Sequence, residues 1–191
     1  MHARNDLGRI GCFRRKNIAA YVLGAALWLL AGAVAANAAH IDIVALGASN
    51  TAGYGVGSNS AFPALLEAML RAKGYDVTVA NAGISGETSA QILSRIDSAV
   101  PPGTKVVILQ ILRGNDARHG VSPVEHEANI QAAVARIKAR GAKVVLAGSS
   151  VTEPIIRSYH QADNIHLTEE GHALLAARLL PEIMRAIGSA R

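Results

Sequence analysis

The chain has 191 residues, a length that predicts a single domain. Half of its residues are apolar, which excludes a globally disordered chain and allows a sizeable core. Lys and Arg outnumber Asp and Glu by 19 to 14, but five of these bases and one acid precede residue 39. The remaining charges nearly balance, so the composition gives no electrostatic support for nucleic-acid binding.

The first 38 residues have the pattern of an export signal. Three basic residues at 14–16 are followed by a charge-free, Ala- and Leu-rich run that ends in Ala36-Asn37-Ala38, a small-x-small site typical of signal peptidase cleavage. We expect cleavage after Ala38, a mature domain over 39–191 and a periplasmic or secreted protein. The run is also long enough for an uncleaved membrane anchor, and the Arg pair leaves a twin-arginine signal open. Cys12, the only cysteine, lies inside this segment.

The mature chain alternates short apolar runs with helical patterns. Strands are predicted at 41–46, 76–80, 105–112 and 143–147, and helices at 62–73, 88–100, 123–140 and 168–187. Thr88 with Gln91, and Ser122 with Glu125, fit capping boxes. Residues 150–164 have no clear period. The order β-α-β-α-β-α-β-loop-α predicts a parallel sheet with helices on both faces.

Polar side chains and glycines follow the predicted strands. Ser49 comes just after the first strand, Gly86 after the second and Asn115 after the third, while Asp163 and His166 precede the last helix. Ligands bind beyond the carboxyl ends of parallel strands, so we expect these residues to gather at one edge of the sheet.

These residue types suit acyl transfer. A serine hydroxyl becomes nucleophilic when a base such as His166 accepts its proton, and Asp163 is spaced to orient the imidazole. The amides of Ser49 and Gly86 and the side-chain NH2 of Asn115 are candidate oxyanion donors. The sequence therefore predicts a catalytic triad of Ser49, Asp163 and His166.

Four blocks resemble the SGNH/GDSL hydrolase family. They are Gly47-Ala48-Ser49, Ser85-Gly86-Glu87-Thr88, Gly114-Asn115-Asp116 and Asp163-x-x-His166, in the family's order. The resemblance covers about 41–187. It implies a three-layer α/β/α, flavodoxin-like fold with a parallel sheet of four to five strands, and hydrolysis of esters or thioesters.

Three features depart from the family's pattern. Ala48 stands where the family usually has Asp, which bears on the geometry of that turn. Arg113 stands where a second Gly is common and is expected to add a cation near the pocket or to narrow it. Residues 150–164 are short for a segment that usually adds a helix and a strand. One pocket wall is therefore expected to be absent or supplied by a second copy, which makes a homo-oligomer possible.

Other interpretations of these residues have less support in the sequence. Ser49 does not lie in a G-x-S-x-G elbow, and Gly53, Gly55 and Gly57 miss the spacing of a dinucleotide-binding loop. Among the other histidines, His126 is predicted to be solvated and His172 to pack or cap. Asp116 is predicted to hold its own loop by local hydrogen bonds.

The sequence thus predicts an exported serine hydrolase acting on a small ester or thioester substrate. No cofactor, metal or nucleic acid is expected. Contact with a membrane is expected only transiently, through the signal segment. The alternatives are a deacetylase of cell-envelope glycans and an inactive binding protein on the same scaffold.

Overall fold

The computed structural model describes residues 40–148 and 153–188. The predicted signal peptide, residues 1–38, lies outside the described residues. No helix of the described part is long and apolar enough to cross a membrane.

Four parallel strands form one sheet in the order β2-β1-β3-β4. They are β1 (Ile41–Gly47), β2 (Val77–Gly83), β3 (Val106–Gln110) and β4 (Lys143–Leu146). Residues 43–47 of β1 and all of β3 are buried, as near-continuous apolar runs require when helices cover both faces. The parallel α/β fold predicted from the sequence is confirmed, with four strands among the described residues.

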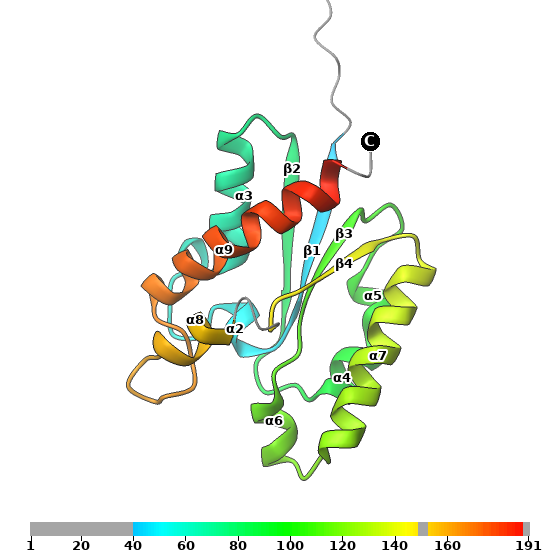
Figure 1. Ribbon diagram of the computed structural model, residues 1–191, viewed down its shortest axis with the longest axis vertical. Coiled ribbons are helices and arrows are strands. Elements are labelled where there is room, and N and C mark those ends of the chain that lie inside the picture. Colours follow the sequence, from blue (N-terminus) through cyan, green and yellow to red (C-terminus); the bar gives the residue numbers. More distant parts are fainter. Residues whose placement is uncertain (1–39, 149–152, 189–191) are drawn as a thin grey trace, which may run out of the picture. The chain divides into compact units, whose positions relative to one another are not determined.

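Helices cover the two faces of the sheet (Figure 1). On one face, α3 (Phe62–Ala72) and α9 (Glu169–Gly188) pack in a cluster that includes Ile43, Val106 and Ile108. On the other face, α4 (Ser89–Ser94), α5 (Ile96–Ala99) and α7 (Pro123–Ala139) pack against Val44 and Val107. This is the three-layer arrangement that the sequence predicts.

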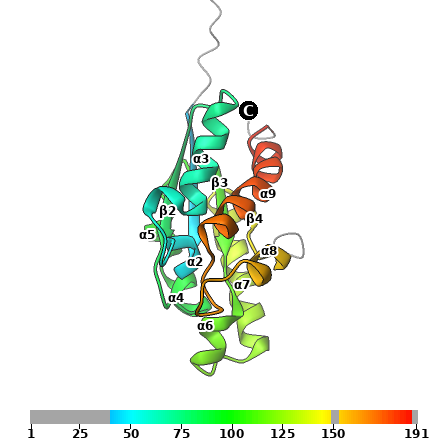
Figure 2. The same cartoon turned by 90° about the vertical axis from the view of Figure 1, so that its left-hand side faces the viewer.

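Short elements that the sequence did not predict lie among the loops. They are α2 (Ser49–Ala52), the 3-10 turn η1 (Ser58–Ser60), α6 (Arg113–Arg118) and α8 (Glu153–Ser158). In both views α2, α6 and α8 lie toward the end of the sheet where the strands finish (Figures 1 and 2). That edge is where the candidate site residues were expected.

The predicted helix at 88–100 is two helices that meet at Arg95. Its capping box is confirmed, because Thr88 accepts from the amide of Gln91 and the Gln91 side chain accepts from the amide of Thr88. Arg95 also spans the loops, since its guanidinium donates to the carbonyls of Gly47 at 3.1 Å and Ala82 at 2.9 Å. The ends of β1 and β2 are therefore held together beside Ser49.

His172 lies buried in α9 and packs as predicted, 0% exposed. Its Nδ1 accepts from the backbone amide of Phe62 at 3.3 Å, and the two rings stack with centroids 6.4 Å apart. Burial lowers the pKa of His172 to about 4, while nearby Glu169 acts in the opposite direction. The neutral imidazole is therefore a core residue and not a catalytic base.

Candidate active site

Ser49 is the first residue of α2, directly beyond the end of β1. The turn needs Gly47, because a Cβ there would lie 2.2 Å from Thr51 Oγ1 and 2.7 Å from the carbonyl of Gln110. Ser49 is 8% exposed and lines a cavity of about 230 Å³. The carboxyl end of β1 thus presents a hydroxyl to a cavity, as the sequence predicts for a nucleophile.

Ala48, where the family pattern has Asp, lines the same cavity. Its carbonyl accepts from the amides of Thr51 at 3.1 Å and Ala52 at 2.9 Å, and these backbone bonds form the first turn of α2. Together with the Arg95 bond to Gly47, these contacts hold the turn without a carboxylate at position 48. The substitution does not prevent a formed turn at Ser49.

Asp163 and His166 form the pair that the sequence predicts. The Nδ1 of His166 lies 2.5 Å from Asp163 Oδ2, and Asp163 Oδ1 accepts from the amides of Ile165 at 2.9 Å and His166 at 3.0 Å. These bonds, first that from the His166 amide, hold the pKa of Asp163 well below its ordinary value. With Nδ1 directed at the carboxylate, the pair leaves Nε2 as the atom that can accept a proton.

The ring of His166 also rests against Tyr54, with ring centroids 4.3 Å apart and planes tilted by 36°. Tyr54 follows α2, so this contact joins the Ser49 segment to the His166 loop. No motif in the sequence marks Tyr54, an aromatic residue in a glycine-rich loop.

Asn50 provides a second link between these two segments and was also missed. Its Nδ2 donates to the carbonyl of Ile165 at 3.4 Å, and its Oδ1 accepts from the amide of Leu167 at 2.9 Å. The amide of Asn50 therefore holds the residues on both sides of His166. Asn50 is only 6% exposed, and its position next to the nucleophile is the only signal the sequence offers.

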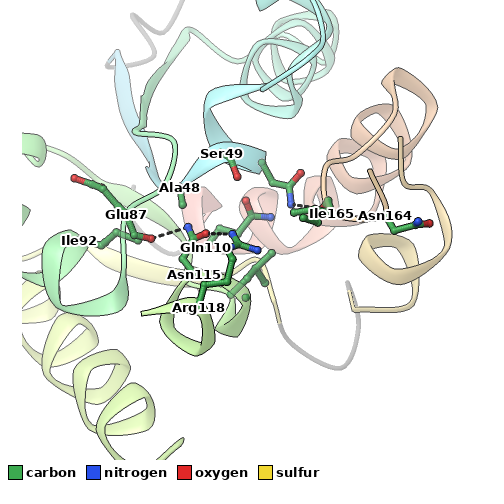
Figure 3. Close-up of a pocket in the computed structure, with 12 residues that line it drawn as sticks. Ala48, Ser49, Glu87, Ile92, Gln110, Asn115, Arg118, Asn164 and Ile165 are labelled. Carbon is green, nitrogen blue, oxygen red and sulfur yellow. Dashed lines mark hydrogen bonds between the residues drawn. The ribbon is translucent and has the colours of Figure 1, made fainter. Parts of the chain in front are cut away.

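Asn115 lies in α6 and not in a loop, yet it lines the cavity with Ser49. Figure 3 shows it between Glu87 and Arg118, with a dashed line to each. Its Nδ2 donates to the carbonyl of Glu87 at 2.8 Å, and its Oδ1 accepts from Arg118. Because an amide NH2 has two hydrogens, one remains for an oxyanion.

Gly86 has φ +87°, a backbone conformation that side chains rarely adopt, and lies in the exposed turn before α4. Across the part of the chain that the structure describes, its amide has no backbone acceptor. The cavity is lined by its neighbour Glu87 and not by Gly86 itself.

The structure brings Ser49 and Asn115 to one cavity, whereas His166 and Gly86 are not part of its lining. Among the described residues, Ser49 and His166 form no hydrogen bond with each other. From the loop that carries His166, Asn164 and Ile165 line the cavity. In Figure 3 Asn164 and Ile165 lie across the cavity from Asn115. Catalytic hydrogen bonds are often long in the absence of substrate, so this arrangement is compatible with a base beside the nucleophile.

Asp116 was predicted to hold only its own loop, but in the structure it links three helices. It is fully buried and accepts from the amide and hydroxyl of Ser89, at 2.7 and 2.5 Å, and lies 2.8 Å from Nδ1 of His126. Burial would raise the pKa of Asp116, but the bonds from Ser89 and His126 hold it below the ordinary value. The prediction that His126 is solvated is wrong, because its side chain is 13% exposed and faces this carboxylate.

The cation at the cavity is Arg118 and not Arg113. Arg118 contributes to the lining, whereas Arg113, the residue flagged from the sequence, does not. Both lie on α6, at opposite ends of this short helix. Arg113 drew attention because it stands where the family often has a second Gly, and no sequence pattern predicts the short helix that brings Arg118 to the cavity.

A family model, the GDSL-like Lipase/Acylhydrolase family, matches residues 45–162. The chain belongs to this family. The match includes Ser49, Gly86 and Asn115 and ends one residue before Asp163. The assignments of individual site residues rest on the geometry above.

Two curated relatives are similar in sequence. Esterase TesA of Pseudomonas aeruginosa is 34% identical over 111 residues, which cover 58% of this chain and 55% of that protein. Thioesterase 1/protease 1/lysophospholipase L1 of Escherichia coli K12 is 32% identical over 125 residues, covering 65% of this chain and 59% of the relative. The chain thus matches little more than half the length of these relatives.

A crystal structure of TesA has the same fold, with a TM-score of 0.67 at 24% identity. The similarity covers 76% of this chain and 99% of that one. The shared fold therefore extends over nearly the whole of the solved TesA chain.

Proposed function

We propose that the protein is a serine hydrolase that cleaves carboxylic ester or thioester bonds through an acyl-enzyme on Ser49. The observation that carries this proposal is the Asp163–His166 pair, tied through Asn50 to the segment that holds Ser49. Membership of the acylhydrolase family and the names of the relatives, esterase and thioesterase, support the same reaction class.

In the first half-reaction, Nε2 of His166 accepts the proton of the Ser49 hydroxyl while Oγ attacks the ester carbonyl. The resulting oxyanion accepts hydrogen bonds from the amides of Ser49 and Gly86 and from Asn115 Nδ2. Collapse breaks the bond to the alcohol or thiol, which leaves with the proton from His166.

In the second half-reaction, His166 accepts a proton from water as the water attacks the acyl-enzyme. Collapse releases the carboxylic acid and returns the proton to Ser49. Asp163 stays ionised throughout and orients the imidazole, in keeping with its lowered pKa.

The cavity favours a short acyl or alcohol group. Its volume of about 230 Å³ is below the roughly 300–1,000 Å³ of pockets that enclose drug-sized ligands. Activity on 4-nitrophenyl esters of rising chain length tests this preference. Activity on acetyl esters alone would favour the glycan deacetylase instead.

Export is the second part of the proposal. The basic, apolar and Ala36-Asn37-Ala38 segments support a signal peptide that is removed in the periplasm or during secretion. Fractionation of cells that express the full chain, followed by N-terminal sequencing, tests it. A mature chain that begins at Ala39 is expected, and an intact N-terminus in the membrane fraction would favour an anchor.

The nucleophile is tested with a fluorophosphonate probe, which reacts with activated serines. Wild-type protein is expected to be labelled and Ser49→Ala to remain unlabelled, with the exposed Ser58→Ala as matched control. Equal labelling of Ser49→Ala would remove Ser49 from its role. No labelling of the wild type would favour the binding protein.

A further inference from the structure

Arg118 places a positive charge at the wall of the cavity that Ser49 lines. It lies at the C-terminal end of α6, and its guanidinium donates to Oδ1 of Asn115 (Figure 3). A guanidinium has five N–H donors in a planar fork, so this single bond leaves most of them for another acceptor.

The charge of Arg118 is not matched by a carboxylate. Within residues 40–148 and 153–188 it forms no ion pair, and its only hydrogen bond is to a neutral amide oxygen. Glu87 lines the same cavity, but its carboxylate lies 2.6 Å from Arg95, and both of these side chains are largely buried. The cavity wall therefore carries one exposed cation that pairs with no carboxylate of the described residues.

A second donor without a partner belongs to the same cavity. Gln110 is 2% exposed, and its Oε1 accepts from the Thr51 hydroxyl at 2.9 Å. Its Nε2 is buried and has no acceptor among the described residues. Gln110 therefore adds a polar side chain to the lining that also carries the Arg118 cation.

The position of Arg118 relates the charge to the reaction. Asn115 is a proposed oxyanion donor through Nδ2, and Arg118 holds the other end of the same amide. An anion bound by Arg118 would therefore lie within a few bond lengths of the carbonyl under attack. A bidentate bond from guanidinium to carboxylate or phosphate is both strong and directional.

From these observations we infer that the substrate carries a second, anionic group close to the scissile ester, and that Arg118 binds it. This inference rests on the proposed ester hydrolysis at Ser49. The shared chemistry is a carboxylate or phosphate-like anion, on either the acyl or the alcohol side of the ester.

Two pairs of esters separate these sources. On the alcohol side, 4-acetoxybenzoate is compared with methyl 4-acetoxybenzoate, its uncharged counterpart. On the acyl side, monophenyl adipate is compared with methyl phenyl adipate. For each pair, the ratio of kcat/KM for the charged ester to that for the neutral ester is measured at low ionic strength, where exposed charges are least screened.

Arg118→Gln is expected to lower this ratio roughly ten- to a hundredfold for at least one pair, the range that one charged hydrogen bond supports. Arg118→Lys is expected to retain part of the ratio, since it keeps the charge but loses the fork. Arg113→Gln removes an exposed cation from the same helix and is expected to leave the ratio unchanged. Added salt is expected to lower the wild-type ratio.

An equal loss of kcat/KM on charged and neutral esters in Arg118→Gln would overturn the inference and leave Arg118 as a positioning residue for Asn115. An unchanged ratio in both pairs would overturn it as well, while Ser49-dependent hydrolysis of the neutral esters would still support the proposed function.

Binding gives a readout that does not need turnover. Calorimetric titration of Ser49→Ala with the two charged esters is expected to show binding that is roughly tenfold weaker or more in Ser49→Ala/Arg118→Gln. This arm decides the inference even if the wild type hydrolyses none of the esters, a result that would count against the proposed function alone. Equal affinities of the single and double variants would overturn the inference.

Discussion

Removal of the Asn50 side-chain amide should lower catalytic turnover more than substrate binding. Asn50 bonds the backbone on both sides of His166, so Asn50→Ala frees the loop that carries the base. The amide of Leu167, a fully buried residue, would lose its acceptor, which costs about 1–3 kcal/mol of the free energy of unfolding. The bond to Ile165 is long at 3.4 Å and adds little to this loss.

The effect on catalysis follows from the geometry of the base. A displacement of the imidazole by about 1 Å lowers the rate on the order of a hundredfold, because proton transfer needs a near-linear contact. We therefore expect Asn50→Ala to reduce kcat by roughly ten- to a hundredfold on a short 4-nitrophenyl ester while KM changes little. Asn50 is itself part of the cavity lining, but Ser49, Asn115 and Arg118 in the same lining are untouched.

Two further variants separate positioning from stability. Asn50→Asp keeps an acceptor for the Leu167 amide but loses the donor to Ile165, so its stability should exceed that of Asn50→Ala. Asn59→Ala, at an exposed asparagine of η1, is the matched control and should resemble the wild type. Urea unfolding and steady-state kinetics measure both effects, and full kcat in a folded Asn50→Ala would refute the positioning role.

Three other predictions concern the triad acid, the buried histidine and the turn at α2. Asp163→Asn keeps an acceptor for the loop amides but faces the imidazole with an amide, so kcat should fall about a hundredfold or more; unchanged kcat would exclude Asp163 from the triad. In the folded protein the pKa of His172 is about 4, below its ordinary value of 6.5, so the imidazole is largely neutral in both states at pH 7. Below pH 6.5 the unfolded chain binds a proton that the folded chain does not. The free energy of unfolding should therefore fall by about 2 kcal/mol from pH 7 to pH 5, and His172→Gln should lose this dependence in urea unfolding; an equal slope in the variant would reject the assignment. Gly83→Ala places a Cβ 2.2 Å from the amide nitrogen of Ala52 and should lower the free energy of unfolding by about 1–3 kcal/mol. Gly57→Ala is the control, because its Cβ would meet only Ser60 Oγ at 3.9 Å. Equal urea midpoints of the two variants would argue against this packing.

The sheet could be predicted because its central strands, β1 and β3, are largely apolar on both faces and its helices have clear ends. The mostly apolar run 41–46, and the capping pair of Thr88 and Gln91, specify local structure within a few residues of sequence. The helical periods of α3, α7 and α9 then left few ways to cover the sheet. The edge that carries the site followed from the parallel order of the strands.

The parts that could not be predicted depend on long-range contacts. Asn50 bonds to Ile165 and Leu167, which lie 115 and 117 positions further along the chain. Asp116 likewise contacts Ser89 and His126 on other helices. No local pattern marks such pairs. The same holds for Arg118, because its place at the cavity depends on the short helix α6, which begins soon after the end of β3.

The proposed mechanism requires that His166, oriented by Asp163, accept the proton of the Ser49 hydroxyl. A crystal structure of the wild-type protein with a phosphonate covalently bound to Ser49 tests it most directly. We predict that Nε2 of His166 lies within about 3.2 Å of Ser49 Oγ or of a phosphonate oxygen, with another phosphonate oxygen accepting from Asn115 Nδ2. An adduct in which the imidazole stays out of hydrogen-bond reach of both atoms would contradict the account.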